Sequence, residues 1–161
     1  MDKQIIPLLD LVRAWVYNPE TLGGHFVYPL SEHLHPTAAE LGDFWYDVNK
    51  KIKEGKEVSI SRWSRWTTPT TVYSREEAQP LYDGDIVRIH WKISHRDIIA
   101  RYRLDYHQQD GQWVFRELGK QPNREYIALV DVLDLEKEFI SMEIVGHAWE
   151  PKWRNVTANV E

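Results

Sequence analysis

The chain has 161 residues and a net charge of −5, a length typical of one domain and a charge that disfavours nucleic-acid binding as the main function. Apolar residues make up 42% and charged residues 28%, which excludes a disordered chain. Because cysteine is absent, disulfide frameworks, thiolate zinc sites and cysteine nucleophiles are excluded.

The N-terminal segment has no features of a signal peptide. Its apolar residues are interrupted by Asp10 and Arg13, and no small-residue cleavage site follows them. No stretch of the sequence approaches the roughly 18 apolar residues that a membrane-spanning helix needs. We therefore expect a cytoplasmic protein that does not bind a membrane.

Two helices are predicted before the first strand. Apolar residues at a spacing of three to four predict a helix over residues 4–17. A second helix is predicted over residues 37–54, where Thr37 and Glu40 have the spacing of a capping box. Lysines near its end and Gly55 after it are typical of a helix C-terminus.

The apolar period changes to two after the second helix, which predicts a sheet over residues 57–147. A second capping box at Ser74 and Glu77 predicts one short helical turn between the first strand and the rest. Asp110 and Gly111 are typical of a tight hairpin turn. The strands after the short helix are expected at residues 87–93, 98–107, 113–118, 126–133 and 139–145.

This order of elements predicts an α+β fold with a single domain over residues 1–161. The two N-terminal helices would pack on a curved antiparallel sheet of about six strands. The order resembles that of the NTF2-like cone fold, which occurs in steroid isomerases and small dehydratases, and the resemblance is one of element order alone. The alternative architecture is a closed antiparallel β-barrel with a helical plug.

Aromatic residues are frequent, with eight tryptophans in the chain. Large rings usually build a core, but they also line cavities for planar or apolar ligands. An α+β cone would hold such a cavity between its helices and its sheet, suited to a small apolar or aromatic molecule. The rings expected to line it come from the second helix and the sheet: Phe44, Trp45, Trp91, Tyr102 and Tyr106.

Acid–base chemistry in such a pocket would suit an isomerase or dehydratase that needs no cofactor, because proton transfer requires groups that titrate near neutrality. Strand alternation turns His90 and His107 away from the apolar face, whereas Tyr102 and Tyr106 face it. The candidate catalytic residues are Tyr102, Tyr106, Asp47, His90 and His107.

Basic residues gather on the polar face of the two longest predicted strands. Residues 86–104 contain five Lys or Arg against one Asp, and residues 124–150 contain two basic against seven acidic residues. Cross-strand charge pairing would account for both segments. Alternatively, this face binds an anion, a polyanion or a protein partner through Arg88, Arg101 and Arg103. It could also form the interface of a homodimer.

Histidines gather in the loop between the two predicted helices. His25, His33 and His35 lie close to Glu32, and neutral imidazoles with a carboxylate suit zinc, iron or nickel. The spacing fits no closed structural zinc signature, and solvated loop histidines are the alternative.

The predicted function is therefore a small-molecule-binding domain with an aromatic-lined pocket and isomerase or dehydratase activity. The alternative function is a non-enzymatic binding or assembly module that uses the basic sheet face.

Overall fold

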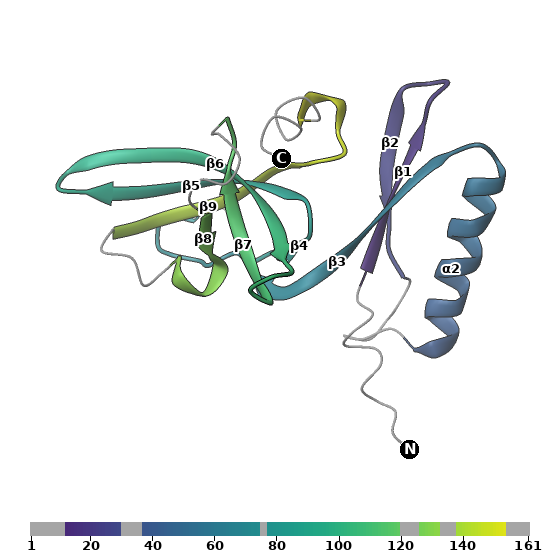
Figure 1. Cartoon of the computed structure of the whole chain (residues 1–161), viewed down its shortest axis with the longest axis horizontal. Coiled ribbons are helices and arrows are strands. Elements are labelled where there is room, and N and C mark those ends of the chain that lie inside the picture. The colour runs from purple at the N-terminus through teal and green to yellow at the C-terminus, as the bar shows by residue number, and fades with distance from the viewer. Residues whose placement is uncertain (1–11, 30–36, 75–76, 120–125, 133–137, 154–161) are drawn as a thin grey trace, which may run out of the picture. The chain divides into compact units, whose positions relative to one another are not determined.

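The computed structural model describes residues 12–29, 37–74, 77–119, 126–132 and 138–153 (Figure 1). Contacts divide the chain into two compact units, residues 1–63 and residues 64–161. Strands dominate both units, and strand β3 (Glu57–Thr67) runs across the boundary between them. Each unit is described in turn.

The first unit is a small sheet with one helix packed against it. Strand β1 (Val12–Asn18) pairs antiparallel with β2 (Gly23–Val27) on one side and with β3 on the other. Helix α2 (Ala38–Lys53) contributes Phe44 and Val48 to a buried cluster with Val12 and Ala14 of β1. Apolar burial between these two layers therefore stabilises the unit.

The second predicted helix is confirmed, and so is its capping box. The Glu40 N–H donates to Thr37 Oγ1 at 3.2 Å, and the Thr37 N–H donates to Glu40 Oε1 at 2.8 Å. Both amides would otherwise lack a partner at the helix start. Three lysines in the last turn complement the negative end of the helix dipole, as expected.

The predicted helix over residues 4–17 is wrong from Val12 onward, because β1 occupies that segment, and residues 4–11 lie outside the described part of the chain. Val12, Ala14 and Val16 share one face of β1 and are buried, and Arg13 and Tyr17 on the other face are buried as well. The β-branched and aromatic side chains of this segment favour a strand once two partner strands are available. Hydrogen bonding to β2 and β3 therefore overrides the local helical spacing.

The second unit contains a curled antiparallel sheet of five strands in the order β8-β7-β6-β5-β9. Its neighbours in that order are all antiparallel, and the register of β5 on β9 shifts at two irregularities. The short strand β4 belongs to the other sheet, ordered β2-β1-β3-β4. The bounds are β4 (Pro80–Tyr82), β5 (Asp85–Ile93), β6 (Arg96–His107), β7 (Gln112–Glu117), β8 (Tyr126–Ala128), the 3-10 helix η1 (Leu129–Asp131) and β9 (Glu138–His147).

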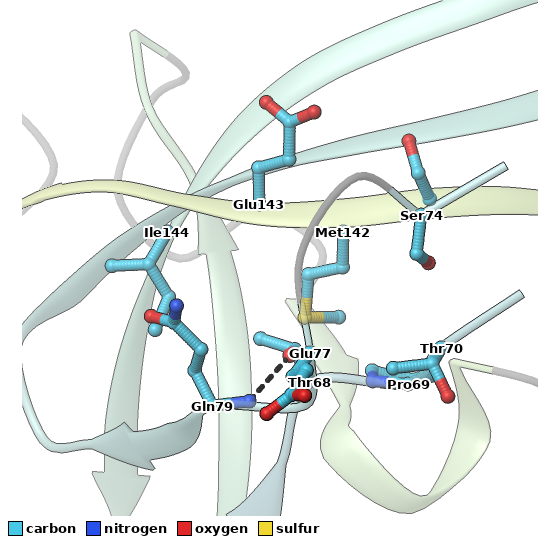
Figure 2. A pocket seen from close by; sticks show the side chains of 10 residues that line it. Thr68, Pro69, Thr70, Ser74, Glu77, Gln79, Met142, Glu143 and Ile144 are labelled. Atoms are coloured by element: carbon cyan, nitrogen blue, oxygen red, sulfur yellow. Dashed lines mark hydrogen bonds between the residues drawn. The ribbon is translucent and has the colours of Figure 1, made fainter.

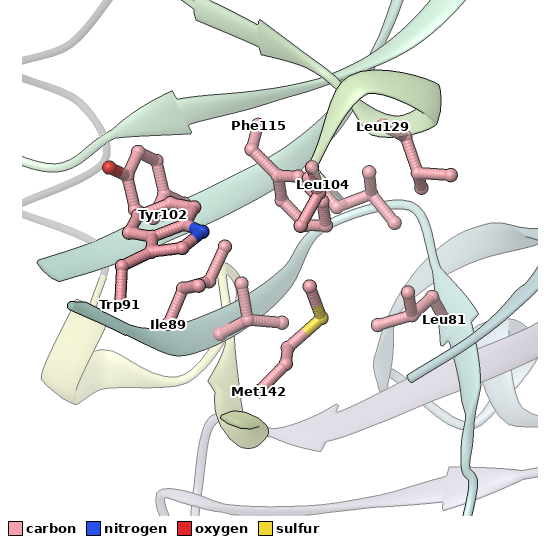
Figure 3. Packing of buried hydrophobic residues seen from close by; sticks show 10 residues of the cluster. Leu81, Ile89, Trp91, Tyr102, Leu104, Phe115, Leu129 and Met142 are labelled. Carbon is pink, nitrogen blue, oxygen red and sulfur yellow. The ribbon is translucent and has the colours of Figure 1, made fainter. Parts of the chain in front are cut away.

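The concave side of this sheet is packed with apolar side chains (Figure 3). Trp91, Leu104 and Phe115 are fully buried there, and Tyr102 packs edge-on against both Trp91 and Phe115. The alternation predicted for β5 and β6 is confirmed, since these inward residues alternate with polar residues that reach solvent.

The predicted turn at Asp110 and Gly111 is present and lies in the connection from β6 to β7. Ser94 and His95, both at positive φ, connect β5 to β6. Two consecutive left-handed residues form the hairpin connection whose twist matches that of the strands. The helical turn predicted at 74–77 is not observed at the described positions, where Ser74 and Glu77 lie in irregular backbone.

The structure thus confirms a mixed α+β fold with antiparallel, curled sheets. The finer NTF2-like order is not confirmed, because β1 and β2 precede α2 and the strands form two sheets. The alternative architecture, a closed antiparallel β-barrel, is not confirmed either. Whether residues 1–161 behave as a single domain stays a prediction. Among the described residues, no helix has the length and apolar character required to cross a bilayer.

Candidate functional site

The polar face of the five-stranded sheet brings several arginines into register. Arg88 of β5 lies directly opposite Arg101 of β6, and Arg103 of β6 lies directly opposite Arg116 of β7. Facing positions on antiparallel strands have their Cβ atoms about 4.5–5.5 Å apart. Four guanidinium groups therefore belong to one small area, and like charges so placed repel unless anions compensate them.

Carboxylates compensate three of the four arginines. Asp105 forms ion pairs with two of them, since Oδ1 lies 2.8 Å from Arg103 Nε and Oδ2 lies 3.3 Å from Arg116 Nε. Arg88 forms an ion pair with Glu143 on the adjacent strand β9. The cross-strand pairing expected between the basic and acidic segments is therefore confirmed at Arg88 and Glu143.

Arg101 differs from its neighbours. Its side chain is exposed, and no carboxylate of the described residues lies within ion-pair distance of it. Its guanidinium carbon lies 6.0 Å from the ring centroid of Trp153, and Lys152 Nζ lies 5.0 Å from the same ring. The uncompensated positive charge of this face is thus concentrated beside one indole.

A groove of about 470 Å³ passes between Arg101 and Trp153. Its polar lining consists of Arg88, Arg101 and Glu117, and its remaining lining is apolar or backbone: Ile99, Ala100, Leu118, Gly119 and Trp153. The groove lies entirely within the second unit. It combines the positive charge of Arg88 and Arg101 with the carboxylate of Glu117, an aromatic ring and small apolar contacts, a lining in which Arg101 could bind an anion that has an apolar body.

Gly146 of β9 positions Trp153. A Cβ atom at this glycine would lie 2.3 Å from Trp153 Nε1 and 2.9 Å from Glu150 Oε1, so the indole rests directly on the backbone. The His147 N–H donates to Glu150 Oε1 at 3.0 Å, and the Trp153 N–H donates to the Glu150 carbonyl at 2.9 Å. These bonds fold residues 147–153 back over the sheet and bury Trp153.

The aromatic residues expected to line one pocket lie in different places. Trp91 and Tyr102 belong to the packed core of the second unit, and Phe44 belongs to the cluster of the first unit. Trp45 is 39% exposed on α2, and Tyr106 is 38% exposed beside Trp113. None of these predicted residues lines the groove.

Burial changes the chemistry of Tyr102. It raises the pKa of this phenol to about 12, and the nearby carboxylate of Glu117, its facing residue on β7, adds to the effect. A general acid or base works best with a pKa near the operating pH. Tyr102 packs in the core, and its raised pKa gives no support to the predicted acid–base role, which stays a prediction.

The histidines expected to transfer protons occur in two separate pairs. His90 Nε2 lies 2.8 Å from Asp97 Oδ1 across the β5–β6 hairpin, and this hydrogen bond lowers the pKa of the Asp97 carboxyl. His107 Nδ1 lies 3.2 Å from Asp110 Oδ2. His90 faces a residue of β6 eight positions before His107, so the two pairs are about 26 Å apart along the strand. The fifth candidate, Asp47, lies on α2 of the first unit.

Of the predicted metal ligands, only His25 is described, and it lies exposed on β2. His33 and His35 fall outside the described residues. Within the described ranges, no group of three or more His, Asp or Glu side chains has the arrangement of a metal site.

Sequence reasoning identified Arg88 and Arg101 but missed Glu117 and Trp153. Trp153 lies beyond the last predicted strand, residues 139–145. The sequence contains one indication of this contact. Gly146 follows a strand rich in bulky residues, and Trp153 comes seven positions later. Glycine within a strand often marks a close approach of another group.

No known protein family matches the chain, and neither a curated protein nor a solved structure shows significant similarity to it. Function is therefore inferred from the chemistry of the groove.

Proposed function

We propose that this protein is a binding module that holds a small organic anion in the groove between Arg101 and Trp153. The observation that carries this proposal is the exposed Arg101 guanidinium at a groove of about 470 Å³. Glu117 also lines the groove, but neither it nor any other described carboxylate forms an ion pair with Arg101. A guanidinium binds a carboxylate or phosphate through two parallel hydrogen bonds, so either group suits it.

The compensation of the other arginines favours a compact anion over a long polyanion. Asp105 neutralises much of Arg103 and Arg116, and Glu143 pairs with Arg88, so no continuous basic track remains on this face. Binding of a polyanion depends on several uncompensated cations along its length. Arg103, predicted as an anion ligand, accordingly supports the sheet by pairing with Asp105.

The body of the ligand is expected to be apolar and planar. Ile99, Ala100 and Leu118 offer small apolar surfaces, and the mostly buried Trp153 adds aromatic surface. An aromatic carboxylate or aryl phosphate would satisfy both parts of the groove. This ligand combines the small aromatic molecule and the basic face that the sequence predicted as separate alternatives.

The test is a titration followed by NMR of the labelled protein, with benzoate and phenyl phosphate as anionic probes and benzyl alcohol as the neutral probe. Both anions, or one of them, should shift the resonances of Arg101 and Trp153, and Arg101→Gln should weaken binding about tenfold or more. One charge-assisted hydrogen bond is worth about 1.5–3 kcal/mol, which corresponds to this loss.

The matched control is Arg96→Gln, because Arg96 is also exposed on β6 but lies outside the groove. This variant should bind the anions as the wild type does. Equal weakening by both variants, equal binding of benzyl alcohol, or no shift at the groove with either anion would refute the proposal.

The predicted isomerase or dehydratase activity, the NTF2-like fold, a homodimer and a cytoplasmic location stay predictions. The packed surroundings of Trp91 and Tyr102 give the activity no support, since no described pocket reaches these side chains. The groove is consistent with a binding role that needs no catalytic group.

A further inference from the structure

A second pocket, separate from the groove, lies where residues 68–74 and 77–79 pass the edge strand β9 (Figure 2). Its volume is about 180 Å³, roughly that of six water molecules at about 30 Å³ each. It lies within the second unit and shares with the groove none of its lining residues. Its lining combines hydroxyl, amide and carboxylate groups with apolar side chains: Thr68, Pro69, Thr70, Ser74, Glu77, Gln79, Ser141, Met142, Glu143 and Ile144.

Hydrogen bonds fix the wall opposite β9. Thr68 and Gln79 close the base of the loop, because the Thr68 N–H donates to the Gln79 carbonyl at 2.8 Å and the Gln79 N–H donates to Thr68 Oγ1 at 3.0 Å. Thr71 Oγ1 donates to the Ile140 carbonyl of β9 at 2.6 Å, and the Thr71 N–H donates to Ser74 Oγ at 2.9 Å. These bonds join Thr68 to Gln79 and attach Thr71 to β9, so the described residues of this wall are held in place.

The two glutamates of the pocket are not equivalent. In Figure 2, Met142 and Glu143 project to opposite sides of β9, with Met142 toward Thr68 and Glu77. The Glu143 carboxylate pairs with Arg88 on the polar face of the sheet, so its charge is already compensated. Glu77 forms no ion pair with any residue that the structure describes, and its side chain reaches solvent at the pocket. Among the lining residues that the structure describes, Glu77 is therefore the carboxylate without an ion pair.

From this combination we infer a binding site for a small organic cation, a primary alkylammonium group. The three N–H bonds of an ammonium match an arrangement of one carboxylate and several hydroxyl or amide oxygens. A short alkyl chain of a few carbons would lie against Met142 and Ile144, whose thioether and branched side chains adapt to an apolar ligand. One carboxylate does not make the multidentate oxygen cage that calcium requires, so an organic cation suits the pocket better than a metal ion.

The experiment is an NMR titration of the full chain with n-butylammonium chloride, with n-butanol as the neutral probe of the same shape. Butylammonium should shift the resonances of Glu77, Thr70 and Met142, and Glu77→Gln should weaken binding at least fivefold. Glu138→Gln is the matched control, because Glu138 is an exposed glutamate at the start of β9 outside the pocket. It should leave the affinity unchanged within about twofold, the range that screened surface charges allow.

The same samples distinguish this site from the groove. Glu77→Gln should leave benzoate binding unchanged, and Arg101→Gln should leave butylammonium binding unchanged. The inference is overturned if butylammonium shifts no pocket resonance, if n-butanol binds equally well, or if Glu138→Gln weakens binding as much as Glu77→Gln. None of these results depends on whether the groove binds benzoate, so the two proposals can fail separately.

Discussion

The substitution Gly146→Ala tests how residues 147–153 form the wall of the groove. The new methyl group would lie 2.3 Å from Trp153 Nε1, whereas ordinary contact begins at 3.4 Å, so the indole must retreat by about 1 Å. Gly146 has no positive φ, and the effect of the substitution is therefore steric alone. The prediction is a less stable second unit whose groove binds benzoate more weakly.

Two responses compete, and their magnitudes decide between them. Releasing Trp153 completely would expose about 150–250 Å² of ring, which costs about 4–6 kcal/mol at 25 cal/mol per Å². Keeping the ring in a strained position costs the typical overpacking penalty of about 1–3 kcal/mol. The second response is cheaper, so we expect Trp153 to stay on the sheet in a shifted position.

Urea denaturation followed by circular dichroism measures the loss of stability, and a benzoate titration measures the groove. Gly42→Ala is the matched control, because nothing lies within 4 Å of a Cβ at Gly42 and an alanine within α2 should stabilise the protein by about 0.5–1 kcal/mol. The reasoning is refuted if Gly146→Ala is as stable as the wild type and binds benzoate with the same affinity.

Two further predictions concern the charge of the second unit. Glu143→Gln removes the partner of Arg88 and should raise the affinity of the groove for benzoate severalfold, an increase that the same NMR titration measures; an unchanged or weaker affinity would contradict the assigned ion pair. Burial raises the pKa of Tyr102 to about 12, so the folded state holds the neutral phenol more strongly than the unfolded state, whose pKa is 10.0. The resulting stability is complete below pH 10 and should fall by roughly 2–3 kcal/mol as the pH rises through 12. Denaturation of the wild type and of Tyr102→Phe across pH 9–12 measures this difference, and equal losses in both proteins would argue against it.

Local chemistry was sufficient to predict the elements that have explicit terminal signals. The capping box at Thr37 marks the start of α2, and the strict alternation around Ile89 and Trp91 marks β5. The helix predicted at Val12 and Val16 was wrong, because apolar residues four positions apart fit both the helical and the strand period. Partner strands distant in sequence decide such a case, and one sequence does not reveal them.

The candidate site, like the fold, could be predicted from the sequence only in part. Alternation alone places Arg88 and Arg101 on the polar face, but only the register puts them opposite each other. The pairing of Arg103 with Asp105 was accessible, because residues two apart on a strand share a face. The contact of Trp153 with Gly146 depends on how residues 147–153 fold back, which no periodicity encodes.

Strand β3 has a consequence for any attempt to produce the two units separately. The boundary between residues 63 and 64 falls inside one continuous strand of 11 residues, where the chain has no linker. A cut at this point would leave each fragment with a partial strand, whose exposed backbone amides and carbonyls would seek another strand. Fragments that end there should therefore self-associate, and limited proteolysis should cleave elsewhere, since proteases require chain that can leave its sheet.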